Sequence, residues 1–185
     1  NTELATQFDV NSFLKRIEDF PDLDNEEEIF KSICIVLINA FVAYPVAVKE
    51  LLKTDLLEPI LQWMLESHSE ITHEVVLRMI SAIAKISAAN IQWIGNNELL
   101  DVVLSEIRLY PESERVIAPC IRILFHLVHD NILTRETATD RGIVHQIIRV
   151  LESMKGAMQV QSDGWLLVRQ FCLTDAVVCE DFFAA

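Results

Sequence analysis

Glycine and proline are scarce in this sequence. The chain has 4 Gly and 5 Pro in 185 residues, few for a fold rich in loops or strands, and this scarcity predicts long helices. Hydrophobic residues make up 51% and charged residues 23%, a mixture that can bury enough apolar surface to offset the entropy of ordering the chain. The composition excludes a disordered chain, and the length favours one all-α domain over residues 1–185.

Basic residues are also few. The sequence has 15 Lys and Arg against 28 Asp and Glu, so its net charge is −13. Because phosphate binding needs clustered Lys and Arg, nucleic acid is excluded as a partner and acidic membranes are disfavoured. The most apolar run, Ile33–Val48, is shorter than the roughly 20 residues that span a bilayer and contains Asn39 and Pro45. We therefore expect no membrane insertion. The start of the sequence has no basic region followed by an apolar run, so no secretory signal is expected there. The sequence opens without Met, which predicts a fragment of a longer protein.

The cysteines form no CxxC pair, and no His follows them at the spacing of a zinc site. All four lie within or beside apolar runs: Cys34, Cys120, Cys172 and Cys179. We interpret them as free thiols that behave as small core residues in a reducing compartment. This interpretation predicts an intracellular protein, cytoplasmic or nuclear.

Motifs for catalysis, metals and cofactors are missing as well. The acidic run Asp22 to Glu28 fails the calcium-loop pattern because Glu27 stands where that loop needs Gly. His126 and His129 share a helical face, but the third protein ligand that zinc needs is not close in sequence. There is no G-x-S-x-G turn and no Gly-rich phosphate loop. The sequence predicts no enzymatic activity, no metal and no cofactor.

A repeat of about 43 residues is the strongest pattern in the sequence. Three apolar segments resemble one another: residues 55–65, 97–107 and 141–151. Leu57, Leu99 and Ile143 occupy equivalent positions in them, at steps of 42 and 44 residues. Apolar residues recur at i, i+4 and i+8 in each segment, which marks one face of a helix. A weaker fourth copy begins near Val10.

A longer and more apolar helix is predicted after each short one. The predicted helices are Glu27–Val42, Thr72–Ala89, Arg115–His129 and Gly164–Val178. Ser113 or Glu114 is expected before the third helix and Asp163 before the fourth, as N-terminal caps. Pro119 is expected either in a first turn or at a kink that divides the third helix into two.

Units of this length, each with a short helix, a turn and a long apolar helix, resemble the armadillo and HEAT class of repeats. The segments Asn96–Leu100 and Asp140–Val144 also resemble the start of an armadillo unit. The resemblance covers nearly the whole chain and implies a right-handed α-solenoid of about four armadillo-like repeats, in which each unit buries its apolar face against its neighbours. The expected repeats are approximately residues 10–53, 54–96, 97–139 and 140–185.

In armadillo proteins the last helix of each unit lines a concave groove that binds extended peptides, often through an Asn repeated once per unit. Asn39, Lys85, His126 and Gln170 stand at the corresponding positions, 26 to 28 residues after the aligned apolar residue. They are polar residues inside apolar helices, which a purely structural core would not favour. Such grooves carry an aromatic residue one turn earlier, where this chain has Ile35, Ser81, Arg122 and Leu166.

Basic residues on the same helices predict a groove that is locally basic or neutral and favours a segment carrying carboxylates. The alternative is that long basic side chains simply extend along the solvated side of each helix. The predicted partner-binding residues are Asn39, Arg78, Ser81, Lys85, Arg122, His126, Arg169 and Gln170.

The C-terminal stretch ends in apolar residues, among them Val178, Phe182 and Phe183, although a terminal repeat should present a polar outer face. Either the natural chain continues into a further repeat, or a partner or a second copy covers this face. The leading hypothesis is a scaffold, not an enzyme, that binds a segment of another protein in its groove. The alternative is a module that assembles through its end faces, and an enzyme is the most distant possibility.

Overall fold

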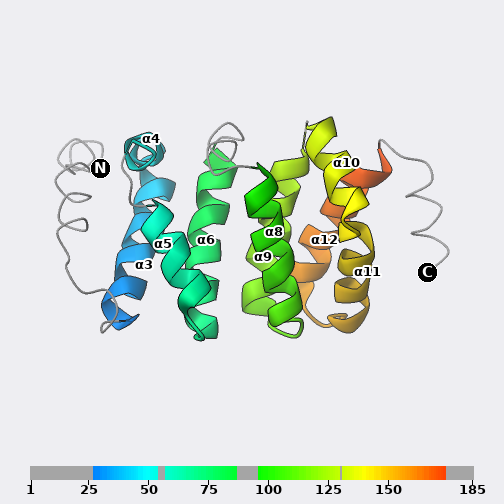
Figure 1. Cartoon of the computed structure of the whole chain (residues 1–185), viewed down its shortest axis with the longest axis horizontal. Coiled ribbons are helices and arrows are strands. Elements are labelled where there is room, and N and C mark those ends of the chain that lie inside the picture. The colour runs from blue at the N-terminus through cyan, green and yellow to red at the C-terminus, as the bar shows by residue number, and fades with distance from the viewer. Residues whose placement is uncertain (1–26, 54–56, 87–95, 130, 174–185) are drawn as a thin grey trace. The chain divides into compact units, whose positions relative to one another are not determined.

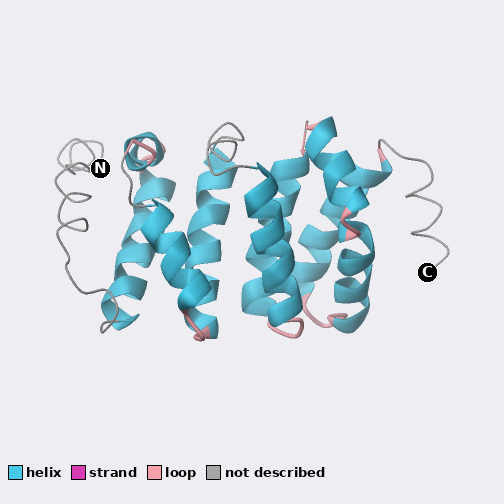
Figure 2. Ribbon diagram, in the orientation of Figure 1, coloured by secondary structure: helices cyan, strands magenta, loops and turns pink. Residues whose placement is uncertain are grey.

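The computed structural model describes residues 27–53, 57–86, 96–129 and 131–173. Every regular element in these ranges is an α-helix, joined by short loops and turns, and no strand occurs in them (Figures 1 and 2). The expectation of an all-α chain is confirmed. The chain divides into two compact units, which meet in sequence at Ile86 and Ser87.

The first unit contains α3 (Glu27–Ala43), α4 (Val46–Leu51), α5 (Leu57–Glu66) and α6 (Glu70–Ile86). The long helices α3 and α6 pack against each other and run in the same direction, with α5 in front of them in Figure 1. Thr72 near the start of α6 donates a hydrogen bond of 3.0 Å to the Glu27 carboxylate at the start of α3. The ring centroids of Phe30 in α3 and Trp63 in α5 are 3.8 Å apart. These contacts join three helices around one apolar core.

The second unit contains α8 (Asn96–Leu109), α9 (Glu114–Val128), α10 (Ile132–Asp140), α11 (Ile143–Ser153) and α12 (Met158–Cys172). Two layers are visible in Figure 1, with α8 and α11 in front of α9 and α12. The helix α9 packs against α8, α10 and α12. Ten of its residues are buried as a result, and Leu124 is completely inaccessible to solvent.

Side chains form hydrogen bonds with backbone groups at both ends of α9. The Ser113 hydroxyl accepts a hydrogen bond of 3.3 Å from the Val116 amide, which confirms Ser113 as the N-terminal cap. At the other end the buried Arg135 of α10 donates two hydrogen bonds, of 3.0 and 3.3 Å, to the Val128 carbonyl. Pro119 lies buried in the second turn, and α9 continues through it as one helix. The expectation that Pro119 marks a first turn or divides this helix was wrong.

The last long helix differs from its prediction. It spans Met158–Cys172, whereas the sequence predicted Gly164–Val178. Asp163 therefore lies inside α12 and is not an N-terminal cap. A Cβ atom added to Gly164 would lie 2.5 Å from the Leu151 Cδ2 atom of α11. This glycine allows α11 and α12 to approach closely, so it is a packing residue and not the start of a helix.

Two short helices, α4 and α10, have no counterpart in the prediction. They give both units the same order of a short, a middle and a long helix, namely α4–α5–α6 and α10–α11–α12. Val46 and Ile132, which begin α4 and α10, are 86 residues apart, and so are Leu57 and Ile143, which begin α5 and α11. This spacing is twice the repeat of about 43 residues seen in the sequence.

Replacing Leu124 with Ala should lower the free energy of unfolding by about 2–5 kcal/mol, because the side chain is fully buried in α9 and its loss leaves a cavity. Urea unfolding followed by circular dichroism measures the change. The matched control is Leu109→Ala at an exposed position in α8, which should cost less than about 0.5 kcal/mol. Equal losses for the two variants would contradict the placement of Leu124.

Glu27 provides a pH-dependent test of the contact between α3 and α6. Hydrogen bonds from Ser69 and Thr72 lower its pKa below the ordinary value of 4.5. Since the folded-state pKa is lowered, the stabilisation is present above pH 4.5 and disappears as the pH falls through the folded-state pKa.

Glu27→Gln should therefore lower the urea midpoint near neutral pH, and the difference from wild type should shrink below pH 4.5. Glu66→Gln is the control, because the Glu66 carboxylate accepts its hydrogen bond from Gln62 of the same helix. A pH-independent effect at Glu27 would show that its ionised form contributes nothing.

Candidate binding surface

Side chains from α9 and α12 meet along one line on the second unit. Arg122 Nε donates a hydrogen bond of 2.6 Å to Asp163 Oδ2, and His129 Nδ1 donates one of 3.2 Å to Gln170 Oε1. In each of these pairs the two residues are 41 positions apart in the sequence. The helices α9 and α12 therefore run parallel, with a constant offset between paired residues. We call the five residues along this line, Arg122, His126, His129, Asp163 and Gln170, the α9–α12 seam.

Arg122 has a structural role at the seam as well as a surface position. Its side chain is 41% exposed, while that of Asp163 is 17% exposed. Gln159 also donates a hydrogen bond of 2.9 Å to the same Asp163 oxygen. The carboxylate thus neutralises Arg122 and fixes its direction. A ligand at this point would meet a paired guanidinium, whose remaining N–H groups can still donate.

Two histidines frame an aromatic ring on α9. The Phe125 ring stacks on the His129 ring, with centroids 5.3 Å apart and planes at 19°. The His126 ring meets Phe125 edge-on, at 5.4 Å and 79°. Phe125 and His126 are half-buried, and His129 is exposed. This arrangement places ring nitrogens beside an apolar surface, a combination that can bind both the backbone and the side chains of a peptide.

Arg169 carries an unneutralised charge next to the seam. It is exposed on α12, and no ion pair or hydrogen bond joins its side chain to another described residue. Leu166 and Leu173, one turn away on either side, are 48% and 66% exposed. The α12 surface therefore offers a cation between two apolar side chains.

The predicted residues of the first unit lie on α3 and α6, and most of them are exposed. Asn39 is exposed on α3, and Arg78 and Lys85 are exposed on α6. Arg78 forms an ion pair of 3.3 Å with Glu74 one turn away. Ser81, by contrast, is only 8% exposed and does not offer its hydroxyl to solvent. Lys85 has no acidic partner within the described ranges, so its charge resembles that of Arg169.

The buried thiols of Cys34 and Cys120 are poor nucleophiles. Burial raises the pKa of Cys34 to about 12 and raises that of Cys120 well above its ordinary value, with the nearby Glu106 charge as a second cause. Neither thiol forms appreciable thiolate near neutral pH. Over residues 27–53, 57–86, 96–129 and 131–173, no cluster of three or more His, Cys, Asp or Glu side chains is arranged to hold a metal ion.

None of the helices described is both long and apolar enough to cross a membrane. The residues predicted for an end-face interface, Val178, Phe182 and Phe183, lie outside the described residues, as does Cys179.

The sequence predicted both helices of this surface and three residues of the seam, Arg122, His126 and Gln170. It did not predict that Asp163 and His129 pair with them. Asp163 was assigned to a helix end, although it is the partner of Arg122. His129 was considered as a metal ligand and as the last residue of its helix, but not as a binding residue, although it contacts both Phe125 and Gln170. The constant separation of 41 residues is close to the sequence repeat, so the repeat itself was the signal that could have paired the two helices.

Comparison with family models, with curated proteins and with solved structures found no match to this chain. Its geometry is therefore the basis on which a function is proposed.

Proposed function

We propose that this chain is a protein-binding scaffold, not an enzyme, and that it binds a segment of a partner protein along the exposed faces of its long helices. The α9–α12 seam carries the proposal, because two parallel helices there present donors, acceptors and an aromatic ring along one line. A peptide backbone repeats its donors and acceptors at short intervals, so such a line suits an extended or helical segment.

We also infer that the chain is a right-handed α-solenoid of four armadillo-like repeats. The shared helix order of the two units supports this inference, as does the 86-residue spacing between Val46 and Ile132. Repeats of 40–47 residues with two or three helices characterise the armadillo and HEAT class. The parallel packing of α3 with α6, and of α9 with α12, is the contact that stacked units of one kind would repeat.

The charges of the chain indicate which kind of partner segment it would bind. The chain carries a net charge of −13, yet Lys85 and Arg169 stand exposed on the long helices without acidic partners in the described part of the chain. A segment with an isolated carboxylate would be attracted to either cation, whereas a strongly acidic segment would be repelled by the chain as a whole. The proposed partner is therefore a protein segment with a few separated acidic residues.

Reversing the charge of Lys85 or Arg169 to Glu should reduce partner binding by about tenfold or more, equivalent to about 1.4 kcal/mol, because the partner carboxylate would then face a like charge. Arg122 is kept unchanged, since Asp163 pairs with it. The intact chain serves as bait in cell extract, and quantitative mass spectrometry compares the proteins retained by each variant.

The controls are Lys49→Glu and Lys155→Glu, which make the same charge change at exposed positions outside the proposed surface. Proteins retained by the wild type and the controls but lost with Lys85→Glu or Arg169→Glu would support the proposal. If all four variants retain the same proteins, these helix faces are not the binding surface.

A second candidate function is assembly through α12. Met158 and Trp165 of α12, and Leu173 directly after it, are 85%, 52% and 66% exposed, so three large apolar side chains face solvent in this region. A second copy of the chain, or a neighbouring protein subunit, could bury them. This face extends the end-face hypothesis to residues that the structure describes.

Sedimentation velocity over a range of concentrations tests assembly. We expect a concentration-dependent dimer that is lost in Leu173→Asp, because burying that carboxylate in an apolar interface is costly. The control is Leu133→Asp, a residue of α10 that is 76% exposed. A monomer at all concentrations, or equal dimerisation of both variants, would reject α12 as a self-association face.

A further inference from the structure

A pocket of about 490 Å³ lies between α8 and α11 of the second unit. It is lined by Ile107, Arg108, Pro111, Gln146, Arg149, Val150 and Ser153. These helices form the front layer in Figure 1, whereas the α9–α12 seam belongs to the layer behind. The pocket is therefore separate from the proposed binding surface, and none of its residues is among those predicted to bind a partner.

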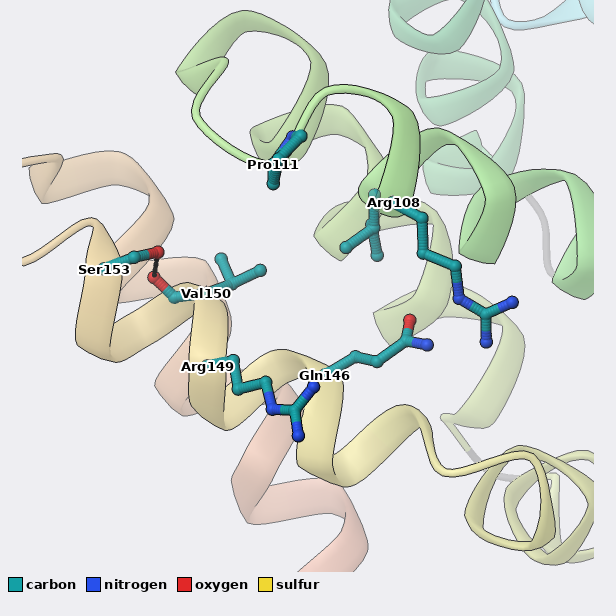
Figure 3. A pocket seen from close by; sticks show the side chains of 7 residues that line it. Arg108, Pro111, Gln146, Arg149, Val150 and Ser153 are labelled. Carbon is teal, nitrogen blue, oxygen red and sulfur yellow. Dashed lines mark hydrogen bonds between the residues drawn. The ribbon is translucent and has the colours of Figure 1, made fainter.

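One end of the pocket is polar. Figure 3 shows Arg108 of α8 and Gln146 of α11 facing each other, with Arg149 extending along α11 beside Gln146. With its amide oxygen toward the guanidinium, the reverse of the orientation drawn, Gln146 accepts hydrogen bonds of 2.8 and 2.7 Å from Arg108 Nε and Nη2. We assign this orientation because two sets of N–H donors cannot face each other. Gln146 thereby holds Arg108 at the pocket and leaves its other N–H groups available.

Two guanidinium groups thus line one pocket without a carboxylate to neutralise them. Within the described ranges, neither Arg108 nor Arg149 forms an ion pair. The exposed acidic residue Asp101 of α8 pairs instead with Arg141, at 2.6 Å. Arg108 and Arg149 can each attract an anion to the pocket, and a guanidinium group matches the flat geometry of a carboxylate.

The other walls are apolar. Ile107 and Val150 are buried side chains of α8 and α11, and Pro111 lines the pocket just beyond the end of α8. The Ser153 hydroxyl already donates its hydrogen to the Val150 carbonyl, at 3.1 Å, so it adds no donor to the pocket. A fully polar anion such as inorganic phosphate would make no apolar contact with these walls. A ligand with an apolar body would cover them.

The volume of the pocket and the net charge of the chain further limit which ligand can bind. A volume of about 490 Å³ is within the range of roughly 300–1,000 Å³ typical of small-molecule sites. The net charge of −13 repels polyanions, so a ligand with a single negative charge is favoured. We propose that the pocket binds a small organic acid, with its carboxylate on Arg108 and Arg149 and its apolar body against Ile107, Pro111 and Val150. This inference goes beyond the proposed scaffold function and does not depend on it.

The probe is 4-phenylbutyrate, titrated into the intact chain and followed by amide chemical shifts in NMR spectra. For about 12 non-hydrogen atoms, a dissociation constant on the order of 1 mM is expected, with the largest shifts in α8 and α11. The uncharged analogue 4-phenylbutanol should bind at least about tenfold more weakly, because it cannot form charge-assisted hydrogen bonds. Equal binding of the alcohol would overturn the role of the two arginines.

Two substitutions test the cations separately. Arg149→Gln and Arg108→Gln should each weaken 4-phenylbutyrate binding about fivefold or more, while Lys155→Gln, an exposed control just beyond α11, should leave it unchanged. If Arg108→Gln perturbs folding, as circular dichroism would show, Arg149→Gln alone decides the question. Wild-type affinity in Arg149→Gln would overturn the proposal.

Two further titrations test whether a different anion occupies the pocket. Inorganic phosphate should bind at least about tenfold more weakly than 4-phenylbutyrate, because it cannot use the apolar walls. Equal phosphate binding would reduce the site to a simple anion site and overturn the proposal. An apolar peptide with a free C-terminal carboxylate is compared with its amidated form. If the free-acid peptide binds more than about tenfold more tightly than 4-phenylbutyrate, a peptide terminus replaces the small acid as the occupant.

Discussion

The packing of one long helix along another is the interaction on which each unit depends. In the first unit α3 packs on α6, and in the second α9 packs on α12. Many of the buried side chains, such as Phe30, Leu37 and Leu124, belong to these helices. A long helix with apolar residues on several sides is insoluble alone, so it requires neighbours on each of those sides. The short helices then cover the sides that the long helices leave open.

Acidic and basic residues serve different purposes in this chain. Acidic side chains occupy the first turns of several helices, including Glu27 in α3, Glu70 in α6 and Glu114 in α9, where they favour the positive end of the helix dipole. Part of the negative charge therefore supports helix starts. The cations Arg169 and Arg149 lie instead on helix faces without acidic partners in the described part of the chain. A protein that is acidic as a whole can thus present local basic positions.

The sequence predicted the elements that have a strong apolar period and missed those that do not. The helices α3, α5, α8 and α11 begin within about two residues of their predicted positions, which is the usual uncertainty of helix ends. The polar segment of α10 gives no such period, because its buried members include Thr134 and Arg135. Exposure of Arg78 and Arg169 agrees with their helical spacing, whereas Ser81, only three residues after Arg78, is buried. Pairs such as Arg122 with Asp163 depend on tertiary contacts that one-dimensional spacing does not contain.

Gly164 of α12 lies at the contact between the front and back layers of the second unit. Because no side chain separates it from Leu151, α11 rests directly on α12 at this point. Val150 is the residue next to Leu151 and forms part of the pocket wall. A Cβ at position 164 would meet the Leu151 side chain, which would have to shift. The helix that supplies one wall of the pocket is therefore supported from behind by a position that has no side chain.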